Sequence, residues 1–167
     1  MVKKTAKIGM FIALAMIFSY IEAIIPINFG IPGIKLGIAN IVVVTSLYIL
    51  GIKETIGISL IRILLMGILF GNVFSLIYSF SGGILSLIGM IICKKFKLFS
   101  TVGVSVVGGV LHNLGQLIAA SIVLNNLSIA YYFSVLLVSG VVTGFVIGIV
   151  STKVIKILTS PKMKVFN

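Results

Sequence analysis

Long apolar runs fill this chain, and nearly all of its charged residues lie in the gaps between those runs. The 167 residues are 60% hydrophobic, and the chain has 13 Lys and Arg residues but only two acidic ones. A soluble domain of this size cannot bury so much apolar surface, so we expect the lipid bilayer to be the solvent for most of the chain. Because no polar stretch is long enough to act as a linker, the sequence indicates one domain over residues 1–167.

Six of the apolar runs are long enough to form helices that cross a membrane. We therefore predict an all-α integral membrane protein with six transmembrane helices, at about 5–25, 32–50, 54–70, 73–93, 100–124 and 130–152. The second and third runs are separated only by the short sequence Ile52-Lys53-Glu54. A shallow re-entrant hairpin would therefore fit this stretch as an alternative to two full crossings.

The positions of the cations predict how these helices are oriented. Eleven of the thirteen lie in alternate gaps, at Lys3, Lys4, Lys7, Lys53, Lys94, Lys95, Lys97, Lys153, Lys156, Lys162 and Lys164. Cytoplasmic segments of membrane proteins carry an excess of Lys and Arg, so we expect these gaps and both termini to be cytoplasmic. The cations flank apolar runs and do not alternate with stacking aromatic residues, so we predict no nucleic-acid partner despite the net charge of +11.

The two remaining cations are Lys35 and Arg62. We expect both in the opposite half of the membrane, together with most of the other polar side chains. An Arg near the middle of a bilayer costs about 2.5 to 3.5 kcal/mol on insertion scales, so Arg62 should face protein or trapped water. We predict a substrate-binding pocket formed by Glu22, Lys35, Asn40, Arg62, Asn72, Tyr78, His112, Asn113 and Gln116. Its two cations favour an anionic or carbonyl-rich ligand, with Glu22 as counter-ion. In the alternative interpretation, Glu22 and Arg62 form an ion pair that only fixes the register of two helices.

The loop that follows the first helix has two interpretations. Prolines stiffen it and glycines allow it to hinge, so it could be a gate that covers the pocket, or it could be an ordinary turn between helices. The residues of this predicted gating loop are Pro26, Asn28, Gly30, Pro32 and Gly33.

Small residues repeat along several of the predicted helices. Lipid gives membrane helices no hydrophobic reason to associate, so small residues that allow close backbone approach mark the faces where helices pack. We expect such packing along Gly140, Gly144 and Gly148. A second stripe on the first helix could contact another membrane subunit or pack within the chain, and it comprises Gly9, Ala13, Ala15 and Ser19.

The scarcity of acidic residues excludes most enzymatic chemistry. The chain contains Glu22 and Glu54 but no Asp, so it lacks the paired carboxylates of hydrolases and the Asp-rich motifs that hold magnesium. It has no phosphate-binding glycine loop ending in Lys and Ser or Thr. His112 has no second His or Asp to complete a metal site, and Cys93 has no partner for a disulfide. We therefore expect no catalysis, no metal and no cofactor.

Four stretches together resemble one bacterial membrane family. They are Pro32-Gly33-Ile34-Lys35-Leu36-Gly37-Ile38-Ala39-Asn40, Arg62-Ile63, Tyr78-Ser79-Phe80-Ser81-Gly82-Gly83 and His112-Asn113-Leu114-Gly115-Gln116. The chain resembles the Gx transporter family, also labelled heptaprenyl diphosphate synthase component I, over about residues 5–155. A multi-pass protein of the bacterial cell membrane is therefore expected.

The two family names imply different functions. The transporter name implies similarity to S components of energy-coupling factor transporters, which capture a vitamin-like molecule and work with a coupling transmembrane subunit and two ATPase subunits. Our main hypothesis is such a substrate-binding subunit, in which the small residues of the first helix meet the coupling subunit. The synthase name implies the alternative, a noncatalytic membrane accessory in the synthesis of the menaquinone side chain.

Overall fold

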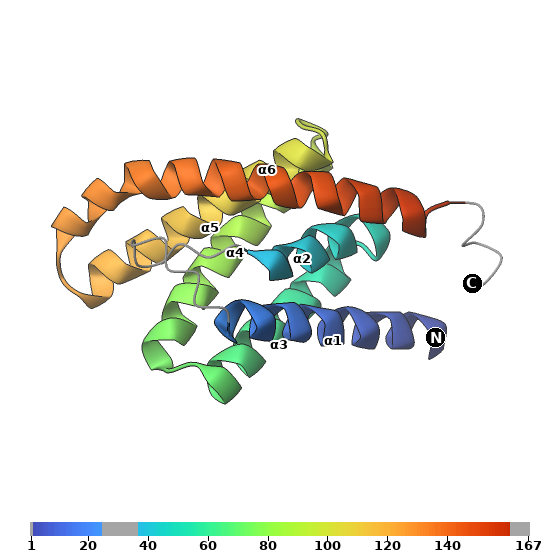
Figure 1. Cartoon of the computed structure of the whole chain (residues 1–167), viewed down its shortest axis with the longest axis horizontal. Helices are drawn as coiled ribbons and strands as arrows, with labels where there is room; N and C mark the ends of the chain where they lie inside the picture. The colour runs from blue at the N-terminus through green and yellow to red at the C-terminus, as the bar shows by residue number, and fades with distance from the viewer. Residues whose placement is uncertain (1, 25–36, 161–167) are drawn as a thin grey trace.

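The described part of the chain is a bundle of helices. The computed structural model describes residues 2–24 and 37–160, which contain six α-helices and one short 3₁₀ helix (Figure 1). The helices are α1 (Val2–Ile24), α2 (Ile38–Ile49), α3 (Ile52–Phe70), α4 (Val73–Lys95), α5 (Thr101–Val123), η1 (Leu127–Tyr132) and α6 (Phe133–Leu158). The predicted all-helical fold and the number of helices are thus confirmed, and the described residues contain no strand.

The helices differ in their suitability for crossing a membrane. Four of those described are long and apolar enough to do so, namely α1, α4, α5 and the continuous stretch of η1 and α6. Helix α3 has 19 residues but includes Lys53, Glu54 and Arg62. Helix α2 has only 12 residues, which at about 1.5 Å per residue is well short of a hydrocarbon core about 30 Å thick. Six full crossings are therefore confirmed only in part.

Several predicted helix boundaries differ from those of the structure by three to six residues. Helix α2 begins at Ile38, after Gly37, rather than at residue 32. Helix α1 already begins at Val2, and α6 continues to Leu158 rather than ending near residue 152. Both extensions run through lysines, because Lys is a good helix former whose ammonium group reaches water from the end of a membrane helix. At its other end α6 begins at Phe133, after η1, whose start is capped by the Asn126 side chain accepting a hydrogen bond from the Ser128 N–H at 2.9 Å.

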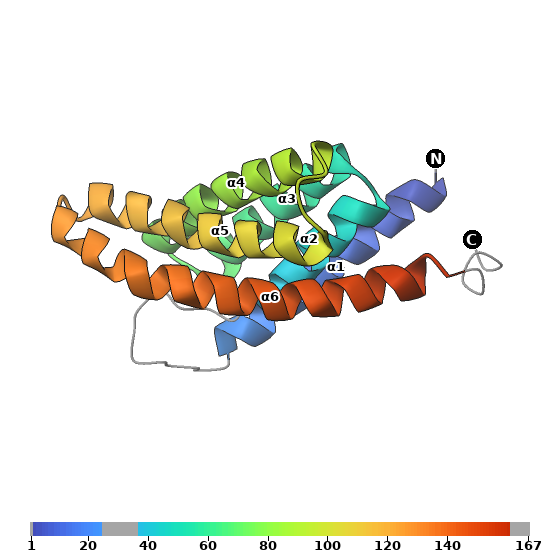
Figure 2. The same cartoon turned by 90° about the horizontal axis from the view of Figure 1, so that it is seen from above.

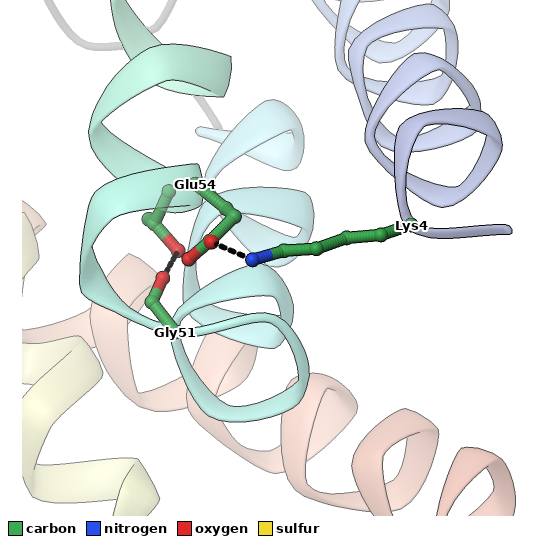
Figure 3. Close-up of polar contacts among 4 residues, drawn as sticks. Lys4, Gly51 and Glu54 are labelled. Atoms are coloured by element: carbon green, nitrogen blue, oxygen red, sulfur yellow. Dashed lines mark hydrogen bonds and ion pairs between the residues drawn. The ribbon is translucent and has the colours of Figure 1, made fainter. Parts of the chain in front are cut away.

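The lysine-rich connections lie together at one end of the bundle. Figures 1 and 2 show the start of α1 and the end of α6 on the same side, with the connection between α5 and α6 at the opposite end. Lys4 on α1 forms an ion pair of 2.5 Å with Glu54 on α3 (Figure 3). Lys94 at the end of α4 donates to the carbonyl of Leu47 and lies 5.0 Å from the ring centroid of Tyr48 on α2. This arrangement agrees with the alternating pattern of cations in the sequence.

The short helix α2 lies inside the bundle. Every residue from Val42 to Leu47 is buried, which suits a helix that is apolar on all sides. One core cluster joins Val43, Val44 and Leu47 to residues of α4, α5 and α6, and a second joins Val42 to residues of α1 and α3. Because α2 belongs to both clusters, it joins α1 to the helices on its other side, whereas α3 also packs directly against α4.

Glycines bring α5 and α6 into backbone contact. A Cβ atom at Gly144 would lie 2.7 Å from Val106 Cα, and one at Gly140 would lie 3.0 Å from Val110 Cα. A Cβ at Gly148 would lie 2.7 Å from Val102 Cα. The predicted packing role of the three glycines on α6 is therefore confirmed, with α5 as the neighbouring helix.

Replacing one of these glycines should separate the two helices. We expect Gly144→Ala to destabilise the protein by about 1 to 3 kcal/mol, because overpacking at a backbone contact forces the helices apart. The measurement is the midpoint of thermal unfolding in detergent. Gly9→Ala is the matched control, since nothing lies within 4 Å of a Cβ built there. Equal midpoints for the two variants would contradict this account of α5–α6 packing.

Candidate functional site

A cavity between the helices collects most of the predicted site residues. It has a volume of about 160 Å³, and its walls come from all six α-helices. Of the predicted residues, those that line it are Glu22, Asn40, Arg62, His112, Asn113 and Gln116. These side chains come from α1, α2, α3 and α5, so residues up to 94 positions apart in the sequence (116 − 22) meet at one place.

The other predicted site residues fall elsewhere. Asn72 and Tyr78 line a neighbouring groove, which they share with Gln116. Lys35 lies outside the described residues, as do the five residues of the predicted gating loop, Pro26, Asn28, Gly30, Pro32 and Gly33.

Arg62 is the one cation among the described residues that line the cavity. Its Nη1 atom is 3.5 Å from the hydroxyl of Ser19 on α1, which is a long hydrogen bond. Its Nε atom is inaccessible to solvent, and it has no acceptor within hydrogen-bond distance among the described residues. A guanidinium presents several N–H groups in a fixed plane, and a pair of them matches the two oxygens of a carboxylate or phosphate. The geometry of Arg62 is therefore suited to binding an anion.

Glu22 does not form a direct ion pair with Arg62. Among residues 4–24 and 37–160, the one ion pair within 4.0 Å is the contact between Lys4 and Glu54. Glu22 Oε1 instead accepts a hydrogen bond of 2.5 Å from the backbone N–H of Gly37, which precedes α2. A carboxylate at this position is favourable because the first N–H groups of a helix lack partners within the helix. Glu22 thus joins the end of α1 to the start of α2 and acts on Arg62 only through space.

The wall that carries His112 and Gln116 depends on close contact between α4 and α5. A Cβ at Gly82 on α4 would lie 2.7 Å from the His112 carbonyl oxygen and 2.9 Å from Gln116 Cγ. The Ser81 hydroxyl donates to the carbonyl of Gly115 at 2.8 Å. Two of the stretches that carry the family resemblance, Ser81-Gly82-Gly83 and His112–Gln116, are therefore packed against each other.

Asn113 is fixed from the side of α6. Its Nδ2 group donates to the carbonyl of Leu136 at 2.8 Å. Since an amide side chain carries its acceptor on a separate atom, this bond leaves the carbonyl oxygen of Asn113 able to accept from a ligand.

The small residues of α1 do not form one continuous face. Of the two interpretations of this stripe, packing within the chain holds for Ala15, which is completely buried in a cluster with Phe11, Val42 and Ile58. Ser19 turns to the cavity and to Arg62. Gly9 and Ala13 are exposed. In this structure, only those two of the four residues present a surface that a second protein can reach.

Hydroxyl groups in the cavity wall were missed in the sequence. The wall includes Ser75, Ser79, Ser86, Ser105 and Thr143. Ser and Thr are common in membrane helices, where their hydroxyls often bond to the carbonyl four residues earlier, as Thr143 does to Ser139 at 2.8 Å. For this reason their presence is a weak signal, although the four-residue spacing of Ser75 and Ser79 places both on one face of α4.

Comparison with known protein families identifies the chain. The model of the family described as heptaprenyl diphosphate synthase component I matches residues 11–154. The chain belongs to this family. The match contains each described cavity residue and the packed contact of α4 with α5. No curated protein and no solved structure gives a significant match to the chain.

The environment of Arg62 predicts an unusual effect on stability. A buried donor without a partner costs about 1 to 3 kcal/mol, and no direct ion pair within the described residues would be lost with Arg62. We therefore expect Arg62→Leu, without ligand, to unfold at the same temperature as the wild type or at a higher one. The control is Lys53→Leu, which removes an exposed cation from the same helix. A midpoint clearly below that of the control would mean that Arg62 serves to hold the helices together.

Proposed function

We propose that this chain is a noncatalytic membrane component of a heptaprenyl diphosphate synthase, and that it binds a small anionic molecule in the cavity around Arg62. One observation carries the proposal. A guanidinium whose Nε has no acceptor among the described residues lies in the wall of an interhelical cavity, in a chain that belongs to this family. Keeping such a group inside a membrane protein is unfavourable, so intramembrane cations mark ligand or ion sites by default.

The distribution of carboxylates supports a noncatalytic role. Prenyl synthases to which the family name refers bind diphosphate through magnesium held by paired Asp-rich motifs, whereas this chain has two glutamates and no aspartate. Glu54 pairs with Lys4 at the lysine-rich end, and Glu22 accepts from the start of α2. We infer that the carboxylates and the magnesium for the reaction belong to a separate catalytic subunit, and that this chain contributes binding.

Co-purification tests the proposal directly. From its native bacterial host, the tagged chain extracted in a mild detergent should bring down a prenyl diphosphate synthase subunit, identified by mass spectrometry. Arg62→Leu should retain that partner, because Arg62 faces the inside of the bundle rather than a surface. Recovery of a coupling membrane protein with two ATPase subunits, and no synthase subunit, would contradict the proposal.

The structure also offers an observation in favour of a second candidate, a substrate-binding subunit of an energy-coupling factor transporter. Gly9 and Ala13 lie exposed on α1, and no atom comes within 4 Å of a Cβ at Gly9. Small exposed residues on a membrane helix allow another helix to approach closely. In this reading α1 contacts the coupling subunit, and the same cavity takes up the substrate. The partners recovered in the co-purification distinguish the two candidates.

Either role requires a defined orientation, and we propose that the lysine-rich end is cytoplasmic. Cysteine labelling in intact cells tests this, starting from a Cys93→Ser background because Cys93 is the sole cysteine. We expect a membrane-impermeant maleimide to label Asn125→Cys, in the turn after α5, and not Lys97→Cys, in the turn after α4. After the cells are lysed, both variants should be labelled. Labelling of Lys97→Cys alone in intact cells would reverse the assigned orientation.

A further inference from the structure

A second cavity adjoins the polar one. It is a groove of about 510 Å³ formed by α4, α5, η1 and the first turns of α6. Three residues, Ser75, Ser79 and Gln116, line both the groove and the cavity that contains Arg62. Ser75 and Ser79 lie one helical turn apart on α4, and Gln116 is on α5. The two spaces are thus adjacent and share a wall of three polar side chains.

The groove differs chemically from the cavity. No charged side chain lines it among the described residues, and most of its wall is apolar, including Phe74, Leu117, Ala120, Leu124 and Leu136. Phe74 and Leu124 are 57% and 60% exposed, so the groove opens outward between the helices. An apolar chain lying in the bilayer can therefore enter it without crossing a polar surface.

The size of the polar cavity limits what it can hold. Pockets for drug-sized ligands measure about 300 to 1,000 Å³, while this one is about 160 Å³. It can take a compact head group but not a long molecule. The remainder of any larger ligand whose head reaches Arg62 must lie elsewhere, and the groove is the adjacent space that shares lining residues with the cavity.

We infer that the ligand is a prenyl diphosphate, with its diphosphate in the cavity beside Arg62 and its isoprenoid chain in the groove between α4, α5 and η1. The inference rests on the proposed function, since it takes membership of the synthase family as the reason to prefer a prenyl chain over other apolar chains. Arg62 provides N–H donors for the head, and Gln116 and the two serines lie where head and chain join. The chain then replaces lipid along the apolar wall.

The test measures equilibrium binding in nanodiscs of phosphatidylcholine, with empty nanodiscs as the blank, because detergent would itself compete for an amphiphile site. The probes are inorganic diphosphate, which is the head alone, and farnesyl diphosphate, which has both parts. We expect farnesyl diphosphate to bind at least about tenfold more tightly than inorganic diphosphate. This gain in affinity corresponds to burial of part of the apolar chain. Arg62→Leu should abolish binding of both probes, whereas Lys53→Leu should change neither.

Variants in the groove test where the chain lies. Ala120→Phe fills the groove and should weaken the binding of farnesyl diphosphate by about tenfold. The affinity for inorganic diphosphate should not change. Leu124→Asn makes the exposed wall of the groove polar without disturbing the core. This variant should weaken the binding of farnesyl diphosphate severalfold. Leu127→Asn is the matched control, because Leu127 is 83% exposed and is not part of the groove wall. Equal effects of the two Asn variants would overturn the assignment of the chain to the groove.

Two other results would also overturn the inference. If inorganic diphosphate binds as tightly as farnesyl diphosphate, the site recognises only a head group, and the proposed function still stands. If phosphatidate in the nanodisc displaces farnesyl diphosphate as effectively as unlabelled farnesyl diphosphate does, the site takes an anionic membrane lipid instead. The proposed function fails separately, when co-purification recovers ATPase and coupling subunits instead of a synthase subunit.

Discussion

Backbone contact between helices is the constraint on which the rest of this structure depends. Apolar side chains gain little by leaving lipid for protein, so helices in a bilayer associate through close packing. Here close backbone approaches occur at glycines, as where Gly144 meets Val106 and Gly82 meets the His112 carbonyl. The contacts on both sides of α5 fix that helix between α4 and α6. Since α5 carries His112, Asn113 and Gln116, the same contacts fix one wall of the cavity.

The cavity follows from what the glycine contacts leave open. Helices α4, α5 and α6 are joined closely. Helix α1 reaches them mainly through the short helix α2, whereas α3 packs directly against α4, where a Cβ at Gly83 would lie 2.5 Å from Ile63 Cδ1. Beyond the start of α2, polar side chains of α1, α3 and α5 face one another around a space. An Arg placed there avoids lipid, and its side chain lines the space. The site therefore lies beside the glycine contacts of α5 and α6, since Gly109 and Gly144 also line the cavity.

Much of this arrangement could be predicted from the sequence, because membrane insertion makes hydropathy and charge direct signals. The helix number, the glycine face of α6 and six residues of the cavity were accessible in this way. The sequence could not decide whether Ala15 packs within the chain or contacts a partner, since a small residue on a membrane helix suits both roles, and the structure shows internal packing. The length of α2 and the hydroxyls of the wall were missed for a related reason. The sequence does not distinguish an apolar residue that faces lipid from one that faces protein. It also does not distinguish a serine that bonds to its own helix from one that lines a cavity.

The two glutamates explain why binding and chemistry are best assigned to different subunits. Glu54 contacts Lys4 at one end of the bundle, and Glu22 contacts the N–H of Gly37 toward the other. Bringing them together on one magnesium ion would require both contacts to break. A second carboxylate supplied by a partner protein requires no such rearrangement. Under the proposed function, this chain therefore holds an anionic head group within the membrane with a cation, and the metal-dependent step takes place on a protein that carries its own acidic residues.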